Sequence, residues 1–221
     1  MVSVICPVWN NSELTHKFLY QHWNLLARPS QGGDVEIIII DNGSTDNTAL
    51  ILASWQKTMG QQLKVIINPY NLGFGPANNQ GAAIVKGDIL VFISNDVEVR
   101  GDYLSLIKSR VDDNALYGAH LLDYDTGWNV FNGEKVDYLA GWCIIATRKV
   151  WDDLGGWDER YIPCDYEDVD LSLTATKKGY LLGEIALPLH HLSGQSAQYL
   201  TGGRLAITLN SQKLFKEKWR F

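Results

Sequence analysis

The chain has 221 residues, of which 46% are hydrophobic and 20% charged, and this composition is typical of a globular rather than a disordered protein. Its formal net charge of -6 excludes the strongly basic character of most nucleic-acid-binding proteins, so we expect no nucleic-acid partner. The length suits one domain with a hydrophobic core of its own.

The cysteines and the N-terminus indicate the compartment. Cys6, Cys143 and Cys164 are far apart and lack CxxC spacing, which argues against a disulfide scaffold and a structural zinc site. The first residues lack the basic and apolar regions of a signal peptide, and no apolar run approaches the ~20 residues of a membrane span. We therefore expect a cytoplasmic protein without a transmembrane segment. The basic tail leaves peripheral contact with an anionic membrane open, with an exposed basic helix face as the simpler interpretation.

Strands and helices alternate through the first half of the chain. Short apolar runs predict strands, and these span residues 2–8, 35–40, 63–67 and 89–93. Helical spacing of apolar residues predicts helices, and these span 12–26, 45–59 and 76–85. The continuous β-branched run at 35–40 is typical of a strand covered on both faces. The alternation favours an α/β fold with a mostly parallel central sheet flanked by helices.

The second half is less regular. It predicts further helices at 103–110, 149–154, 168–178 and 204–221, and strands at 116–122, 139–146 and 184–189. Between the first two of these strands, residues 123–135 are rich in Gly, Asn and Asp and predict a long loop. Since no linker or repeat interrupts the chain, we expect a single domain over residues 1–221.

Polar residues follow each strand of the first half. They occupy residues 7–10, 41–46, 68–75 and 94–98. Each segment alone is explained as a turn or a helix cap. Together they predict a polar pocket, because ligands of parallel sheets bind beyond the carboxyl ends of the strands. The segment 71–75 matches neither GxxxxGK[ST] nor GxGxxG, which excludes the common glycine-rich phosphate loops.

Three acidic or histidine-containing segments are candidates for chemistry. Asp96 follows the strand at 89–93, where a carboxylate can bind a divalent cation that holds a diphosphate; alone, it would be only a surface turn acid. Of the adjacent His190 and His191, at most one can easily join the site, because neighbouring strand residues point to opposite faces.

The third segment contains four acids within six residues: Asp165, Glu167, Asp168 and Asp170. Such acids can simply stabilise the N-terminus of a helix. Alternatively, neighbouring carboxylates raise the pKa of one of them and suit it to act as a general base. The spacing places Glu167 and Asp170 on one helix face and Asp168 on another.

These segments, taken in order, resemble the family 2 glycosyltransferases, which have the GT-A fold. The matching stretches are 4–10, 40–46, 71–81, 94–99, 155–159, 167–171 and 191–194. Each stretch alone is a weak match, but seven in the right order cover nearly the whole chain. The resemblance implies a nucleotide-sugar-binding half at about 1–99, an acceptor-binding half at about 100–203, and a C-terminal helix at 204–221.

The resemblance also implies roles for single residues. On the donor side would lie Pro7, Trp9, Asp41, Asn68, Asn78, Asn79 and Asn95, with Asp41 at the nucleotide base. Residues 94–96 take the place of the DxD motif, so that Asp96 and His191 would bind Mn²⁺ or Mg²⁺; Ser94 departs from the first acid of that motif. Asp168 would be the catalytic base. The acceptor would be bordered by Trp142, Trp157, Asp158 and Glu167.

The implied activity is inverting transfer of a sugar, of the hexosyltransferase type, from a nucleotide-diphosphate sugar to a hydroxyl of a glycan or another acceptor, in surface glycan or polysaccharide synthesis. Two alternatives stay open. A sugar nucleotidyltransferase would need a glycine-rich N-terminal loop with a basic residue, which residues 6–12 lack. An inactive sugar-nucleotide or glycan-binding module would not need Asp96, Asp168 and His191 together, and it would not hydrolyse nucleotide sugars.

Overall fold

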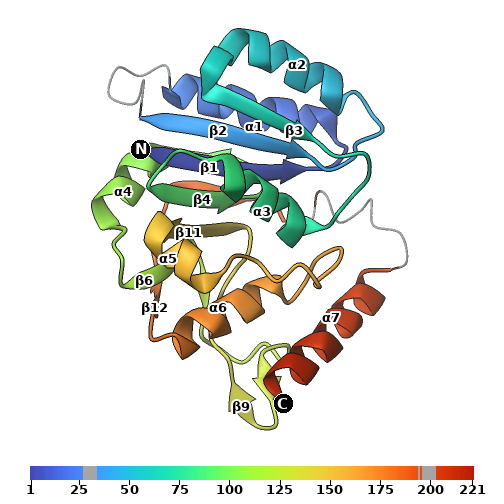
Figure 1. The fold of residues 1–221 in the computed structure, drawn as a ribbon, viewed down its shortest axis with the longest axis vertical. Coiled ribbons are helices and arrows are strands. Elements are labelled where there is room, and N and C mark those ends of the chain that lie inside the picture. Colours follow the sequence, from blue (N-terminus) through green and yellow to red (C-terminus); the bar gives the residue numbers. More distant parts are fainter. Residues whose placement is uncertain (27–33, 194, 196–202) are drawn as a thin grey trace.

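The computed structural model describes residues 1–26, 34–193, 195 and 203–221. A seven-stranded sheet with strand order β12-β6-β11-β4-β1-β2-β3 forms its centre (Figure 1). The strands of this sheet are β1 Val2–Val8, β2 Val35–Asp41, β3 Leu63–Ile67, β4 Ile89–Ile93, β6 Ala115–Gly118, β11 Cys143–Thr147 and β12 Leu181–Glu184. Only β11 runs antiparallel to its two neighbours within this described sheet. The predicted mostly parallel α/β sheet is therefore confirmed.

Seven α-helices are described. They are α1 Ser12–Leu26, α2 Thr48–Met59, α3 Phe74–Ile84, α4 Tyr103–Arg110, α5 Arg148–Leu154, α6 Glu167–Lys177 and α7 Arg204–Trp219, with a short 3₁₀ turn at Gly60–Gln62. Their bounds agree with the predicted helices to within three residues at each start. Among the described residues, no helix is both long and apolar enough to cross a membrane.

Both faces of the sheet are covered, as the β-branched run at 35–40 predicts. All seven residues of β2 are buried. Ile37 and Ile39 belong to one core cluster, which the apolar residues of α1, α2 and α4 complete, whereas Ile38 and Ile40 belong to a second cluster with α3, α5 and α6. Successive strand residues thus bury their side chains against different helical layers, because side chains alternate between the two faces of a sheet.

A third, smaller cluster attaches α7 to the rest of the molecule. Phe215 of α7 is fully buried among Phe131, Tyr161 and Tyr166. Figure 1 shows α7, in red, beside α6 and at the end of the molecule remote from α2. The cluster contains residues from the 123–135 segment, from α6 and from α7, so these three elements form one packed unit.

The strand order creates a natural ligand site. The neighbours of β1 are β2 on one side and β4 on the other, so the chain leaves β1 in one direction and later returns on the other side. At such a topological switch point, the loops after the two strands separate and leave a crevice at their carboxyl ends. The relevant ends here are Val8 of β1 and Ile93 of β4.

Three predicted strands were wrong in extent. The segment 116–122 divides into β6 and a separate β7 Leu121–Leu122, and 139–146 divides into β10 Tyr138–Leu139 and β11, with β7 and β10 paired as a small ribbon. The strand predicted at 184–189 instead forms two strands, β12 and β13 Leu189–His191, on either side of a segment that contains Pro188. Proline cannot donate to a β-ladder, so it favours such an interruption.

The predicted loop at 123–135 contains a short hairpin, β8 Val130–Phe131 and β9 Glu134–Lys135. Its turn is Asn132-Gly133, and both residues have positive φ angles, of 49° and 81°. Asn-Gly is a strong sequence signal for such a turn, and the prediction of a loop overlooked it. A further short strand, β5 Val97–Val99, follows β4 and pairs with β13.

Candidate active site

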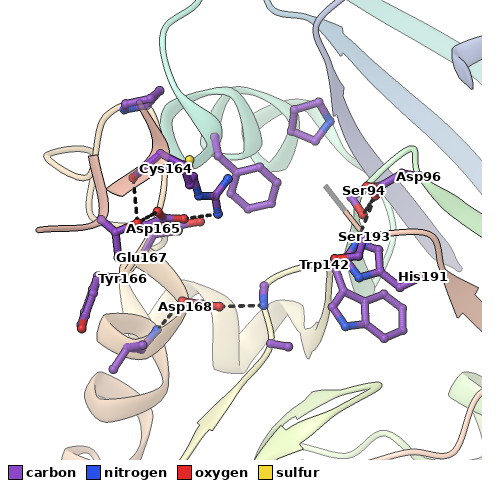
Figure 2. Close-up of a pocket in the computed structure, with 18 of the residues that line it drawn as sticks. Ser94, Asp96, Trp142, Cys164, Asp165, Tyr166, Glu167, Asp168, His191 and Ser193 are labelled. Carbon is purple, nitrogen blue, oxygen red and sulfur yellow. Dashed lines mark hydrogen bonds and ion pairs between the residues drawn. The ribbon is translucent and has the colours of Figure 1, made fainter. Parts of the chain in front are cut away.

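A cavity of about 1030 Å³ lies at the carboxyl ends of β1 and β4. Its lining includes Trp9, Asp96 and His191, together with Glu167 and Asp168 from the start of α6. Figure 2 shows Asp96 and His191 on one side of this space and the two acids of α6 on the opposite side. The residues that the sequence singles out as metal ligand and as base therefore share one cavity, at the switch point of the sheet.

Asp96 is held in place by two neighbours. It is only 5% exposed, and its Oδ1 accepts a hydrogen bond from Ser94 Oγ at 2.6 Å and lies 3.2 Å from His191 Nε2. Burial by itself would raise the pKa of Asp96, but the contacts with His191 and Ser94 outweigh it and hold the pKa below its ordinary value. Ser94 thus orients the Asp96 carboxylate. The DxD motif has an acid at position 94, and the comparison with that motif did not predict this role for a serine.

His191 reaches Asp96 because β13 pairs antiparallel with β5, which directly follows Asp96. In this register His191 lies opposite Val97, and the backbone N–H of Leu192 donates to the Asp96 carbonyl oxygen at 2.8 Å. The Trp142 ring stacks on the His191 ring, with centroids 5.0 Å apart and planes inclined by 9°. His190 is exposed, and only His191 lines the cavity.

This wall suits a divalent cation that binds together with a phosphate ligand. In the part of the chain that the structure describes, no three His, Cys, Asp or Glu side chains form a metal-binding group. Among the described residues, this wall offers the carboxylate of Asp96 and the imidazole of His191. Mg²⁺ and similar ions are often bound by one or two protein ligands and complete their coordination with phosphate oxygens and water. The pair Asp96 and His191 fits that pattern.

Asp168 faces the same cavity from the N-terminal end of α6. Its Oδ2 accepts a hydrogen bond from the Gly141 N–H at 2.9 Å, and its Oδ1 accepts one from the Val169 N–H, also at 2.9 Å. Burial raises the pKa of Asp168 to about 6, although these two hydrogen bonds work in the opposite direction. A carboxylate with a pKa close to the working pH is suited to accept a proton from a substrate.

Gly141 makes this hydrogen bond possible. A Cβ atom at this position would lie 3.2 Å from Asp168 Cβ and 3.3 Å from Asp168 Oδ2. A side chain there would push the carboxyl group away from the backbone N–H. The absence of a side chain at residue 141 therefore fixes the distance between Asp168 and the turn that connects β10 to β11.

Glu167 is the most unusual polar residue of the cavity. It is 7% exposed, and among the described residues its Oε2 has no hydrogen-bond partner. Burial, followed by the charge of Asp168, raises the pKa of Glu167 well above its ordinary value. A buried carboxyl oxygen without a partner is costly, and this cost adds to the preference of Glu167 for its neutral form.

The other two acids of the cluster bind α7. Arg204 and Thr208 both contact the Asp165 carboxylate, with the Thr208 hydroxyl at 2.6 Å. At the far end of the helix, Lys218 donates to Asp170 at 2.7 Å. Asp165 and Asp170 are thus paired with basic residues of α7. Asp165, Glu167 and Asp168 all line the cavity, and of these three only Asp165 has an ion pair among the described residues.

This division contradicts the predicted helix faces. The i,i+3 spacing groups Glu167 with Asp170, whereas the structure groups Glu167 with Asp168 on the cavity wall. The cavity lies beyond the N-terminal end of α6 rather than along its side. The first two side chains of a helix both reach such a space, so the periodicity along the helix does not apply to them.

The turn before α6 has an uncommon backbone. Asp165 and Tyr166 have φ angles of 75° and 68°, a region that non-glycine residues occupy only at a cost of about 1–3 kcal/mol each. Two further residues of α7 hold this turn, since Ser211 Oγ donates to the Cys164 carbonyl at 3.0 Å and Gln212 Nε2 donates to Tyr166 Oη at 2.8 Å. Helix α7 therefore fixes the direction in which α6 begins.

The residues that the resemblance assigns to the donor side are divided between the cavity and its surroundings. Pro7, Trp9 and Asn95 line the cavity. The other four do not belong to the described lining of the cavity, and their side chains form hydrogen bonds with neighbouring residues instead. Asp41 accepts from the Ser44 N–H, and Asn68 bonds to Asn42 and Gln80. Asn78 donates to the Phe74 carbonyl, and Asn79 donates to the Trp157 carbonyl and to Glu159. Their assigned roles stay predictions.

The residues assigned to the acceptor are divided in the same way. Trp142 and Glu167 line the cavity, whereas Trp157 is 2% exposed and packs in the core cluster beneath α3. Asp158 pairs with Arg160 at 2.6 Å and Lys218 at 2.9 Å, and the hydrogen bonds from Arg160 are the main reason why its pKa is lowered. Asp158 thus helps to anchor α7.

Several cavity residues were not predicted as site residues. These are Asn42, Asn71, Trp128, Tyr138, Tyr166 and Arg204. Asn42 and Asn71 belong to the polar segments 41–46 and 68–75, which the sequence places at the pocket as whole segments. The other four come from the 123–135 segment and its surroundings, from the residue before Glu167 and from α7, and no motif marks them. Gly194 of the stretch 191–194 lies outside the described residues.

Comparisons with known proteins identify the family of this chain. The chain matches the family described as "Glycosyl transferase family 2" over residues 3–151, which is more than half of its length. Undecaprenyl-phosphate 4-deoxy-4-formamido-L-arabinose transferase of Edwardsiella ictaluri is 29% identical over 155 residues, which cover 70% of this chain and 46% of that protein. Protein y4gI of Sinorhizobium fredii is 22% identical and is covered over 28% of its length. The chain therefore spans less than half of either relative.

Solved structures show the same fold. The mannosyltransferase PcManGT from Pyrobaculum calidifontis, in complex with GDP-Man and Mn²⁺, superposes with a TM-score of 0.63 at 22% identity, over 83% of this chain and 54% of that one. GalNAc-T7 with UDP, GalNAc and Mn²⁺ gives a TM-score of 0.70 at 15% identity, over 98% and 47% of the two chains. The chain belongs to family 2 of the glycosyltransferases and has the GT-A fold.

Proposed function

We propose that this chain transfers a sugar from a nucleotide-diphosphate sugar to an acceptor hydroxyl, with inversion at the anomeric carbon. The observation that carries this proposal is the position of Asp96 and Asp168 on facing walls of one cavity. The proposal is supported by the family and by the ligands named in the related structures, which are the nucleotide sugar GDP-Man in one and the nucleoside diphosphate UDP in others.

The wall with Asp96 and His191 is the proposed diphosphate side. Mn²⁺ or Mg²⁺, held there by these two residues, would offset the negative charge that develops on the leaving diphosphate. The Trp142 ring stacks on the His191 ring and holds it in its orientation. The hydrogen bond from Ser94 holds the Asp96 carboxylate in the orientation in which it faces the imidazole. Mn²⁺ in two of the related structures supports this assignment.

The wall with Asp168 is the proposed acceptor side. The oxygen of the acceptor hydroxyl attacks the anomeric carbon while the bond from that carbon to the diphosphate oxygen breaks. The nucleoside diphosphate leaves with the electron pair of the broken bond, and the hydroxyl proton passes to Asp168. Because Asp168 lies across the cavity from Asp96, attack comes from the side opposite the leaving group, and one displacement inverts the configuration.

The biological setting belongs to the proposal as well. An undecaprenyl-phosphate sugar transferase among the relatives supports a role in surface glycan or polysaccharide synthesis.

Hydrolysis of nucleotide sugars tests the activity without knowledge of the acceptor. A panel of UDP-, GDP- and dTDP-sugars is incubated with the chain and Mn²⁺, and the free nucleoside diphosphate is measured. We expect slow release from at least one donor, no release in EDTA, and recovery when Mn²⁺ or Mg²⁺ is added in excess. No release from any donor would indicate a binding module, and full release in EDTA would remove the cation from the reaction.

The contact between Gly141 and Asp168 gives a second test. Gly141→Ala is expected to lower kcat for transfer about 10- to 100-fold, because displacement of a reacting group by a fraction of an ångström disturbs its alignment. The Kd for the nucleoside diphosphate with Mn²⁺ is expected to stay the same. Gly60→Ala serves as the control, since a Cβ there meets nothing within 4 Å and the strain of its φ of 57° affects only stability. An unchanged kcat in Gly141→Ala would contradict the role of this contact.

A further inference from the structure

Trp128 is a cavity residue to which neither the family resemblance nor the relatives assign a role. It lies in the turn before the β8–β9 hairpin, lines the cavity, and keeps 44% of its surface exposed. An indole ring gains a large amount of free energy when it is covered, so a half-exposed Trp on a cavity wall is well placed to bind a flat apolar surface. Sugar rings present such a surface on the face that carries their C–H groups.

The position of Trp128 is fixed by its backbone. Its carbonyl oxygen accepts a hydrogen bond from the Tyr166 hydroxyl at 2.7 Å, and its N–H donates to Thr126 Oγ1 at 3.3 Å. The adjacent Asn129 is fully buried, and its side chain accepts from the Thr126 N–H at 3.0 Å and donates to the Val136 carbonyl at 3.1 Å. The indole therefore projects from an ordered turn.

The same contacts connect Trp128 to the acids of α6. Tyr166, which bonds to the Trp128 carbonyl, directly precedes Glu167 and Asp168 in the chain. The ring and the two carboxyl groups thus belong to one packed unit, on the acceptor side of the cavity. Since the indole and both acids line one cavity, a sugar ring on the indole would occupy the same space that these carboxyl groups border.

The lack of an available cation on the described part of this wall selects against an anionic acceptor. The described residues form no ion pair with Glu167 or Asp168, and Arg204, which also lines the cavity, is already paired with Asp165. A phosphate group would meet two acidic groups without a free cation, which is unfavourable in a partly buried site. A neutral hydroxyl can instead hydrogen-bond to the carboxyl groups of Glu167 and Asp168, both of which line the cavity.

We propose that the acceptor is a neutral carbohydrate whose terminal ring stacks on Trp128, with its hydroxyl groups directed to Glu167 and Asp168. This inference rests on the proposed sugar transfer and adds the class of the acceptor. It also separates this chain from the undecaprenyl-phosphate transferase that it resembles, whose named acceptor carries a phosphate group.

The test compares acceptors and variants with the donor that the hydrolysis panel identifies. The acceptor probes are neutral disaccharides and octyl glycosides on one side and farnesyl phosphate on the other. For the wild type we expect transfer to at least one neutral glycoside and none to farnesyl phosphate. For Trp128→Ala we expect the KM for that glycoside to rise about tenfold or more, and for Trp128→Phe, which keeps a stacking ring, we expect a smaller rise.

Tyr20→Ala is the matched control. Tyr20 is an aromatic residue of α1 that is 55% exposed and does not belong to the described cavity wall, so its removal is expected to leave the KM for the glycoside unchanged. The Kd of UDP or GDP with Mn²⁺, measured for each variant, shows that the protein is folded.

Equal KM values for wild type and Trp128→Ala, or transfer to farnesyl phosphate in preference to the neutral glycosides, would overturn the inference. Failure of the proposed function looks different, since the wild type would then release no nucleoside diphosphate from any donor. That outcome would remove the basis of the present inference together with the proposed function.

Discussion

Replacing Asp168 by asparagine is expected to reduce the rate of sugar transfer by about 10²–10⁴-fold, which is the usual contribution of a general base. The asparagine side chain has the same shape and can still accept the hydrogen bond from the Gly141 N–H through its oxygen. It cannot take up the proton of the attacking hydroxyl. The measurement is kcat for transfer, together with the Kd of the nucleoside diphosphate in Mn²⁺, which is expected to stay within about twofold of the wild type.

The pH dependence should follow from the same residue. Because burial raises the pKa of Asp168 to about 6, the wild-type rate is expected to fall about tenfold for each pH unit below 6, as the base becomes protonated. The residual rate of Asp168→Asn should lack this dependence. A variant with undiminished turnover, or a wild-type rate that does not change between pH 7 and pH 5, would contradict the assignment of the base.

Stability provides a control that is independent of activity. The folded chain binds the Asp168 proton more tightly than the unfolded chain, whose carboxyl group has the ordinary pKa of 3.8. The resulting contribution to the free energy of unfolding is present below about pH 4 and is lost as the pH rises through 6, by at most about 3 kcal/mol since Asp168 keeps partial contact with solvent. The free energy of unfolding of Asp168→Asn should therefore increase relative to that of the wild type as the pH rises from 4 to 7.

Removal of the Asp96 carboxylate is the second change with a large expected effect. In Asp96→Asn, binding of UDP or GDP in the presence of Mn²⁺ is expected to weaken by more than about 100-fold, and the rate of donor hydrolysis should fall with it. The reason is that Asp96 is the only carboxylate on the described wall that carries His191, so the proposed cation site loses its single negatively charged protein ligand. Calorimetry with and without Mn²⁺ measures the change.

The control for this variant is Asp112→Asn. Asp112 is an exposed acid outside the described cavity wall, which accepts hydrogen bonds from Tyr117 and Asn114. Its replacement should leave both the affinity and its dependence on Mn²⁺ as in the wild type. If Asp96→Asn retained Mn²⁺-dependent nucleotide binding, the cation would have to be held elsewhere, and the diphosphate side of the proposal would be wrong.

The sequence predicted the parallel part of the fold well because the signal there is local and strong. The β-branched run of β2 and the helical spacing of α1 are patterns that burial on both faces of a sheet produces directly. The second half was less predictable because its strands are two to five residues long and lie in three small ribbons as well as in the main sheet. Short strands carry too few residues for a periodic pattern to be read.

The position of the candidate site could be predicted where residues follow the parallel strands of the first half. Asp96 could be placed at the end of β4, and the position at the switch point then follows from the topology. What the sequence could not show is which of the four clustered acids keep their carboxyl groups free for a ligand. That depends on Arg204 and Lys218 of α7, about forty to fifty residues further along the chain, which bind Asp165 and Asp170 and leave Glu167 and Asp168 as the cavity acids without an ion pair among the described residues.

Trp128 was missed for a related reason. Its segment has the composition of a loop, and only the hydrogen bond from Tyr166 and the buried Asn129 place the indole on the cavity wall. An exposed Trp in a sequence is compatible with many roles, and its geometry relative to the acids becomes known only from the folded chain.

The arrangement as a whole can be tested with a crystal structure of Asp168→Asn bound to Mn²⁺ and the nucleotide sugar that the hydrolysis panel identifies. The diphosphate is expected beside Asp96 and His191, with the anomeric carbon directed across the cavity toward residue 168. A nucleotide sugar bound outside this cavity, or one whose sugar points away from α6, would contradict the proposed division of the two walls.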